Sequence, residues 1–227
     1  MLKVNRSKKY LGRLLWLIPV VLLIGCLAKV AIWEQYYYQS KQGSPRASAA
    51  SNDIIEINRV DETDVTPQQI SEHSVPDQQP RYLAIEKIGL TKSRIIAVGT
   101  SSNGQLQSPS NIFDVGWYQY SGLPGQAGVA IYDGHNGGPT KIGVFKYLPN
   151  LQLGDIITIE TGNGHKYHYQ VHDNLTVPLA QADQYMSTAQ ASPIPGREAL
   201  SIITCTGEWS QSQQTYLSRQ FLRAVRI

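Results

Sequence analysis

Cysteine is scarce in this chain of 227 residues, which contains only two. Cys26 lies inside a long apolar run near the N-terminus, so Cys205 is the only cysteine in the rest of the chain. An intramolecular disulfide is therefore not expected. A single thiol of this kind is either a small buried apolar side chain or a reactive group, and its presence alone leaves both open.

A strong charge of either sign is also missing, because the formal net charge is only +3. Residues 34–80 are rich in acidic side chains, and 81–227 are close to neutral. Basic residues crowd the first 13 positions, namely Lys3, Arg6, Lys8, Lys9 and Arg13. Nothing resembles the basic stripe of a nucleic-acid-binding protein, so we expect no nucleic-acid partner.

Long apolar runs are limited to one, which extends without a charge over residues 14–28 and continues past Lys29 to Trp33. About 20 helical residues span a membrane. The basic cluster before the run places the N-terminus in the cytoplasm. We therefore expect a cytoplasmic tail over 1–13, a single-pass signal anchor in the cell membrane over 14–33, and the remainder outside the cell. A cleaved signal peptide, or lipidation at Cys26, remains an alternative.

The composition changes near Arg81. Residues 34–80 are rich in Ser, Gln, Asp and Glu without an apolar period, which predicts a flexible extracellular stalk. From 81 to 227, short segments rich in Ile, Val and Tyr alternate with turn residues, with no repeat and no βαβ alternation. The expected strands are 82–88, 94–98, 128–132, 156–161, 166–171, 200–204 and 220–225.

Turn and helix signals complete this expectation. Gly162-Asn163-Gly164 predicts a hairpin, and helical propensity is confined to short pieces near 141–148 and 181–187. The fold class predicted for 81–227 is mainly β: one closed or nearly closed barrel with a few short helices, preceded by one transmembrane helix.

Cys205 stands at the end of an apolar strand, Ala199 to Thr204, and a polar run follows it. A nucleophile at a strand end is held rigidly while it faces a cleft, as acyl transfer requires. His135 has a similar position, in a loop with glycines on both sides that follows the expected strand 128–132. The alternatives are a core cysteine and a turn histidine without a role.

The other histidines do not form a metal site. His168 and His172 share one face of a strand at a separation of roughly 13 Å, too far to bind one metal. His165 falls in the hairpin turn and His73 in the stalk. We expect no metal site and no cofactor, and we find no acidic cluster that would indicate calcium.

Arg219 lies on or just before the last expected strand. Arg219, Arg223 and Arg226 can all be read as outward-facing charges of a barrel. A permanently protonated guanidinium near a thiol is also able to hydrogen-bond a tetrahedral oxyanion.

Taken together, these segments resemble the sortase family. The matching motifs are Asp133-Gly134-His135, then Thr204-Cys205 at a strand end, then Arg219 fourteen positions later. Further segments are similar to the class D to F branch: 83–89, 98–99, 115–118 and 123–125. The resemblance covers residues 81–227. Two departures are Ser201-Ile202 in place of the usual Thr-Leu, and Asp133 where Ala is common, which places a carboxylate near His135.

The resemblance implies a sortase-like barrel and a two-step transpeptidation. The Cys205 thiolate attacks the Thr–Gly carbonyl of an L-P-x-T-G-like sorting signal and forms a thioester. His135 donates a proton to the leaving amine and accepts one from the incoming amine, while Arg219 binds the oxyanion. The two cationic groups are expected to lower the pKa of Cys205, and Thr204 is expected to help bind substrate.

The partners implied are surface proteins or pilins that carry a sorting signal, with an amine of a peptidoglycan precursor or a pilin lysine as acceptor. Two other functions remain open. A cysteine hydrolase would pass the acyl group to water, and a tethered β-domain would bind wall polymer without catalysis. The signal variant, the acceptor, a housekeeping or pilus role, calcium dependence and the oligomeric state are not indicated.

Overall fold

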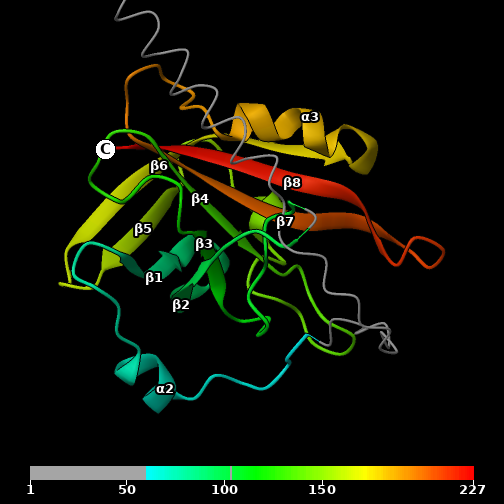
Figure 1. Cartoon of the computed structure of the whole chain (residues 1–227), viewed down its shortest axis with the longest axis horizontal. Coiled ribbons are helices and arrows are strands. Elements are labelled where there is room, and N and C mark those ends of the chain that lie inside the picture. Colours follow the sequence, from blue (N-terminus) through cyan, green and yellow to red (C-terminus); the bar gives the residue numbers. More distant parts are fainter. Residues whose placement is uncertain (1–59, 103) are drawn as a thin grey trace, which may run out of the picture. The chain divides into compact units, whose positions relative to one another are not determined.

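The computed structural model describes residues 60–102 and 104–227, and it shows a closed barrel of eight strands. The strands are β1 (Pro80–Ile85), β2 (Leu90–Val98), β3 (Val115–Tyr118), β4 (Val129–Gly134), β5 (Ile156–Thr161), β6 (Lys166–Pro178), β7 (Ala199–Ser210) and β8 (Thr215–Arg226). Around the barrel the order is β1-β2-β3-β4-β7-β8-β6-β5, closed by β5 on β1 (Figure 1). The mainly-β barrel expected from the sequence is confirmed.

Helices are few in the described residues. They are α2 (Pro67–Glu72), α3 (Leu179–Ala189) and the short 3-10 helices η1 (Glu86–Ile88) and η2 (Leu148–Asn150). The helix expected near 181–187 is α3. None of the helices within 60–102 and 104–227 is long and apolar enough to cross a membrane. The expected tail over 1–13, the anchor over 14–33 and Cys26 all lie outside the described residues.

Two parallel pairings determine where the polar loops meet. β2 pairs with β3 and β4 pairs with β7 in parallel, whereas the other neighbours are antiparallel. β4 and β7 are kept in register by the pairs Val129 with Ala199 through Asp133 with Ile203. The chain that leaves β4 therefore continues beside the last third of β7.

The core fills the barrel with the inward side chain of every second strand residue. Leu83 and Ile85 of β1, Ile157 and Ile159 of β5 and Tyr169 of β6 are all buried. Each fully buried aliphatic side chain contributes about 1.5–3 kcal/mol relative to exposure. In β6 the alternate residues His168 and His172 face solvent, as the sequence pattern predicts.

A second, smaller cluster lies on the outer face of the barrel, where α3 covers β6 and β8 (Figure 1). Ala182 and Ala189 of α3 pack there with Val177 and Phe221, and Ile203 of β7 borders the cluster. Beyond this cluster the β7–β8 hairpin, orange to red in Figure 1, extends away from the barrel. α3 therefore marks which face of β7 is the outer one.

The segment 60–80 differs from the expected flexible stalk. The backbone of Asp61 pairs with Ser110 and Ile112, and α2 begins with a capping box between Thr66 and Gln69. The hydroxyl of Tyr82 on β1 donates to the Ile70 carbonyl. These bonds hold residues 60–80 on the barrel. The expectation of a flexible stalk depended on the lack of apolar residues in this segment, and composition does not reveal hydrogen bonds of this kind. The rest of the expected stalk, 34–59, lies outside the described residues.

Two further expectations need correction. β3 was not among the expected strands, because its four residues are too few to show alternation. The expected helix over 141–148 is a series of turns that leads into η2. Gly143 is the reason: a Cβ there would lie 2.3 Å from the His135 carbonyl oxygen, and that oxygen accepts from Phe145 N at 3.0 Å. Gly143 N and Phe145 N donate to the carbonyls of Asn136 and His135 instead of to residues four positions earlier, so no α-helix forms here.

Candidate functional site

Cys205 and Arg219 lie directly opposite each other on β7 and β8. Paired residues of neighbouring antiparallel strands have Cβ atoms roughly 4.5–5.5 Å apart and point to the same face. The Cys205 thiol is free and partly exposed. The structure therefore brings together two of the three candidate catalytic residues.

Cys205 belongs to the outer face of the barrel wall. Leu200 and Ile202 point into the core, whereas Ile203 borders the cluster under α3 and the Ser201 hydroxyl donates to the Ala189 carbonyl at 2.6 Å. By alternation along β7, Cys205 shares the face of Ser201 and Ile203. The alternative of a core cysteine does not fit this position.

The β7–β8 hairpin fixes the Arg219 guanidinium through its own atoms. Nη1 donates to the carbonyls of Tyr216 at 2.9 Å and Ser218 at 3.0 Å, and Nη2 donates to Thr215 Oγ1 at 3.2 Å. A guanidinium carries five N–H donors, so the bonds recorded in the described residues leave Nε–H and one Nη2–H for another acceptor. A fixed fork of this kind suits an oxyanion.

His135 is the first residue after β4, beside Cys205 in the parallel register. Asp133 pairs with Ile203, and Thr204 Oγ1 donates to the Gly134 carbonyl at 2.8 Å, so the next positions along the two chains are His135 and Cys205. The imidazole Nε2 lies 2.7 Å from the Pro109 carbonyl oxygen. A carbonyl only accepts, so Nε2 carries a hydrogen. No hydrogen bond in the described part of the chain joins this ring to the thiol.

The loop after His135 is held by the segment that begins at residue 60. The Glu62 carboxylate accepts from the backbone N–H groups of Thr140 and Lys141, both at 2.8 Å, and from Thr140 Oγ1 at 2.7 Å. These bonds hold the pKa of Glu62 below its usual value, with the Thr140 hydroxyl as the largest cause. Glu62 thus ties the N-terminal segment to the His135 loop, a contact that no local pattern in the sequence could reveal.

The electrostatics of Cys205 differ from the expectation. Burial raises the pKa of the Cys205 thiol, Arg219 lowers it, and Asp133 raises it further. The net direction is upward, so the predicted lowering by two cations is wrong for this conformation. Desolvation outweighs the one cation that acts on the sulfur, and the resting group is a neutral thiol.

Asp133, which the sequence places near His135, is a further charged group of the site. Its side chain is buried, and this burial raises its pKa to about 7, with the hydrogen bond from Ser108 Oγ to Oδ2 acting in the opposite direction. Oδ1 is buried and has no hydrogen-bond partner among the described residues. The sequence signal was the departure at the position before Gly134-His135.

Thr204, expected to contact substrate, has a different position. It is 3% exposed, and its hydroxyl is used by the Gly134 carbonyl at 2.8 Å. Its side chain points to the inner side of β7 by alternation. In this structure the Thr204 side chain joins β7 to the end of β4, and its hydroxyl does not face the thiol side of β7.

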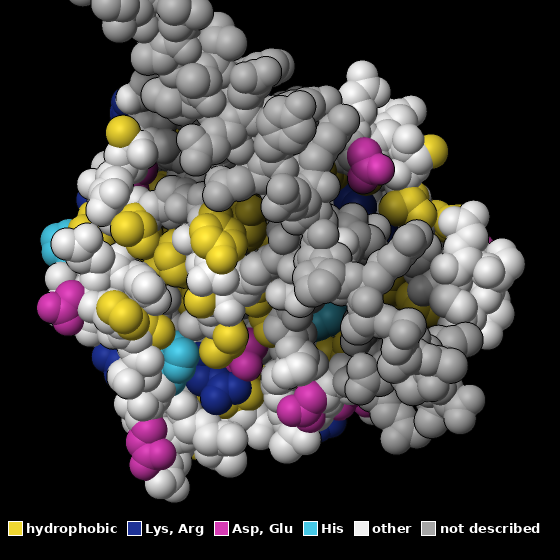
Figure 2. All heavy atoms as spheres, in the orientation of Figure 1, with side chains coloured by type: hydrophobic (Ala, Val, Ile, Leu, Met, Phe, Trp, Pro, Cys, Tyr) yellow, Lys and Arg dark blue, Asp and Glu magenta, His cyan; other side chains and the backbone are white. Residues whose placement is uncertain are grey.

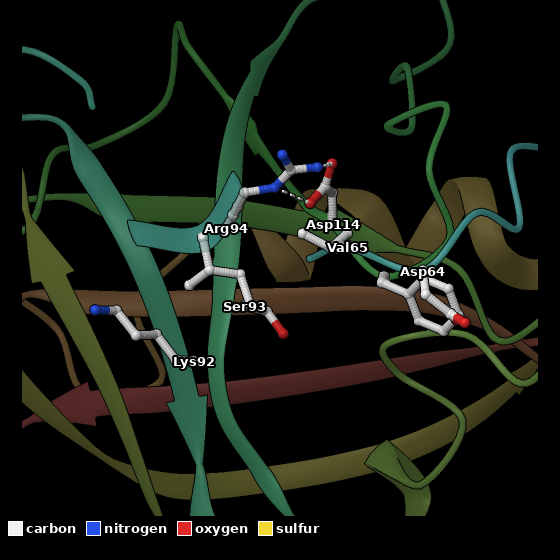
Figure 3. A pocket seen from close by; sticks show the side chains of 8 residues that line it. Asp64, Val65, Lys92, Ser93, Arg94 and Asp114 are labelled. Carbon is white, nitrogen blue, oxygen red and sulfur yellow. Dashed lines mark hydrogen bonds and ion pairs between the residues drawn. The ribbon is translucent and has the colours of Figure 1, made fainter. Parts of the chain in front are cut away.

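The remaining candidates lie outside this site. His73 bonds through Nε2 to the Ile95 carbonyl at 3.0 Å, and no group of three or more His, Cys, Asp or Glu within the described ranges is placed to hold a metal ion. A cavity of about 240 Å³ lies between the N-terminal segment and β2. Figure 3 shows Arg94 paired there with Asp114, and neither Cys205 nor His135 lines it.

The surface around the barrel carries mixed charges. On the face drawn in Figure 2, the acidic and basic side chains of the described residues are interspersed with hydrophobic ones and form no basic stripe. An accessible thiol on a rigid strand, opposite a fixed cation and beside a histidine loop, is the arrangement that acyl transfer through sulfur requires. The class of protein that this fold and site define is therefore a cysteine-dependent enzyme.

Comparison with protein families gives the family. Residues 83–226 match the family described as the sortase domain. The chain belongs to the sortase family, and it is a cysteine transpeptidase that acts on sorting signals. No curated protein matches the chain.

Solved structures similar to this chain include sortases of two classes. A sortase D5 transpeptidase of Clostridium perfringens has 21% identity and a TM-score of 0.45, covering 66% of this chain and 79% of that one. Sortase C1 of Streptococcus agalactiae has 24% identity and a TM-score of 0.48, covering 72% of this chain and 77% of that one.

Proposed function

We propose that Cys205 is the nucleophile of this transpeptidase, that Arg219 stabilises the oxyanion and that His135 carries the proton. The observation that carries the proposal is the direct pairing of Cys205 with Arg219 across β7 and β8. The Arg219 side chain leaves β8 on the same face as the thiol, and its two remaining N–H groups are the donors proposed for the tetrahedral oxygen. His135 follows β4, the parallel neighbour of β7.

The proposed reaction has two steps. The Cys205 sulfur attacks the Thr–Gly carbonyl carbon of an L-P-x-T-G-like signal, and the C–N bond breaks as His135 protonates the leaving amine. An amine of a peptidoglycan precursor or a pilin lysine then attacks the thioester, gives up a proton to His135 and frees the thiol. Because burial raises the pKa of the resting thiol, its proton passes to His135 together with the attack on the carbonyl carbon, once bound substrate aligns the groups.

The proposal includes the location of the enzyme. The basic cluster over 1–13 and the apolar run over 14–33 support a single-pass anchor with its N-terminus in the cytoplasm. The catalytic domain then lies outside the cell, where both the sorting signal and the acceptor amine reach it.

The test uses the full-length chain in detergent with a panel of fluorogenic L-P-x-T-G-like peptides and a soluble amine. We expect cleavage and an amine-linked product, both abolished by Cys205→Ala and unchanged by Cys26→Ala, which removes the other cysteine. Cleavage without amine linkage would indicate a hydrolase. Turnover that survives Cys205→Ala would overturn the proposal, and no turnover on any peptide would favour the wall-binding alternative.

Arg219 has a test of its own in the same assay. Arg219→Lys keeps the charge but lacks the fork, so kcat should fall about 10²-fold or more while KM changes little. Arg223→Lys is the matched control, because Arg223 on the same strand pairs with Asp173 away from the thiol. An equal loss in both variants would assign Arg219 a structural role.

A further inference from the structure

One short segment of the chain contacts both polar residues at the end of β4. Ser108 Oγ donates to Asp133 Oδ2, and the carbonyl of the next residue, Pro109, accepts from His135 Nε2 at 2.7 Å. Asp133 and His135 are separated only by Gly134. The segment 108–109 therefore fixes a carboxyl group and an imidazole at once.

The Asp133 carboxyl faces the same side of the sheet as the thiol. Asp133 pairs with Ile203, two residues before Cys205, and alternation brings Asp133, Ile203 and Cys205 to the outer face. Positions on this diagonal are roughly 7–8 Å apart. Burial is the largest cause of the raised pKa of the Cys205 thiol, Arg219 lowers this pKa, and the Asp133 carboxyl adds a smaller upward contribution across this distance.

Space for the carboxyl is built into β3. Gly116 pairs with Asp133, and a Cβ on Gly116 would lie 2.2 Å from Asp133 Oδ1. Oδ1 remains buried against this glycine with no hydrogen-bond partner in the part of the chain described. Desolvation without a partner for Oδ1 disfavours the ionised carboxylate, so this site favours the protonated carboxyl.

We propose that Ser108 and Asp133 form a positioning pair. Ser108 holds the Asp133 carboxyl by its hydrogen bond and so keeps the neighbouring Pro109 carbonyl against His135 Nε2. The charge of Asp133 then controls how readily Cys205 gives up its proton. This inference rests on the proposed role of Cys205 and adds two positioning residues to it. Neither residue contacts the reacting atoms.

The elements packed around Asp133 bring few competing charges. The 108–109 segment presents Ser108, and β3 presents Gly116, both uncharged. The thiol faces Arg219 from β8, and His135 follows on the same chain as Asp133. Of these groups, Asp133 is the one that can carry a negative charge near neutral pH, since its pKa is about 7.

The consequence is a pH-dependent thiol. Below about pH 6 Asp133 is protonated and exerts no charge on Cys205; above about pH 8 it is ionised and opposes the thiolate, since its pKa is about 7. Asp133→Asn removes the charge at every pH and keeps the shape. The effect of a unit charge at this separation is on the order of one pH unit.

The test measures the rate at which iodoacetamide alkylates Cys205 in the full-length chain carrying Cys26→Ala, from about pH 5 to pH 9. We expect Asp133→Asn and the parent to react equally below about pH 6, and Asp133→Asn to react about tenfold faster above pH 8. Asp183→Asn, which removes an exposed carboxyl on α3, is the matched charge control and should follow the parent.

Ser108→Ala gives a second, independent readout. The hydrogen bond from Ser108 lowers the pKa of Asp133. In the Ser108→Ala background, the alkylation rates with Asp133 and with Asn at position 133 should therefore begin to differ at a higher pH. Because the Pro109 carbonyl is then less firmly held, the ring resonances of His135 should also shift in NMR spectra.

The outcomes separate this inference from the proposed function. Profiles that superimpose at all pH values, or that differ by one constant factor, would overturn the positioning pair even if peptides are processed. A pH-dependent difference in alkylation rate between Asp133→Asn and the parent, without turnover of any peptide, would support the positioning pair. It would count only against the proposed reaction on sorting signals.

Discussion

At the scale of single residues, Gly116 and Asp133 depend on each other. A Cβ at position 116 would meet Asp133 Oδ1 at 2.2 Å and Pro109 Cδ at 3.0 Å. We predict that Gly116→Ala lowers the free energy of unfolding by about 1–3 kcal/mol, as overpacking does. Denaturant unfolding measures this loss.

The double variant Gly116→Ala with Asp133→Ala provides the control. Removing the carboxyl opens the space that the new methyl group needs, so the two changes together should cost less than the sum of the single costs. Strictly additive costs would show that Gly116 matters for another reason.

The buried Asp133 carboxyl also makes stability depend on pH. Its pKa is raised from 3.8 to about 7, so the folded state holds this proton more tightly than the unfolded state. That stability is fully present below about pH 4 and is lost as the pH rises to about 7. From about pH 4 to pH 7, the free energy of unfolding of Asp133→Asn should rise relative to that of the wild type by on the order of 4 kcal/mol, as measured by thermal unfolding. A difference that stays constant with pH would contradict the prediction.

Some of these residues were predictable and others were not. Cys205, His135 and Arg219 stand out because strand-end positions and family motifs are local features of the sequence. Asp133 was visible as a departure from the motif, but its partner Ser108 lies 25 positions earlier in an irregular segment without a pattern. The bond from the Thr204 hydroxyl to the Gly134 carbonyl could not be foreseen, because it depends on the strand register; a substrate contact of Thr204 stays a prediction.

At the scale of elements, the strands were predicted best where alternation or a turn marks them. β5 has the expected bounds, and the Gly162–Gly164 turn joins it to β6 as a hairpin. β6 and β8 are longer than expected, because their outer residues are polar and their pairing with each other is set by tertiary contacts. The cyclic order of strands, with its two parallel pairs, has no local signal.

The Glu62 contact belongs to this scale, since it joins the N-terminal segment to the loop over 136–143. We predict that Glu62→Ala speeds amide hydrogen exchange at Thr140 and Lys141, whose N–H groups it accepts from, and lowers kcat several-fold by loosening His135. Glu72→Ala is the control, because within residues 60–102 and 104–227 Glu72 accepts only from Gln68 of α2. Unchanged exchange at both amides would show that the contact does not hold the loop.

At the scale of the whole molecule, the folded domain begins earlier than its composition suggests. Backbone pairs of Asp61 with Ser110 and Ile112, and the bond from Arg81 Nε to the His73 carbonyl at 2.6 Å, join 60–80 to the barrel. We predict that a chain starting at residue 60 melts at a higher temperature than one starting at residue 81, by several degrees. Equal melting temperatures would show that residues 60–80 do not stabilise the barrel and act only as a stalk.

The way the chain enters the barrel has a mechanical consequence. Residues 61 and 62 precede β1 and are bonded to the segments that hold the loop after His135. Tension applied to the chain before residue 60 therefore stretches the hydrogen bonds of Asp61 and Glu62 first. The force reaches the loop after His135 through these bonds before it reaches the strands of the barrel. A force of this kind would act on the loop that follows His135 while the eight-stranded wall stays intact, so the strength of these few bonds sets the force that the loop withstands.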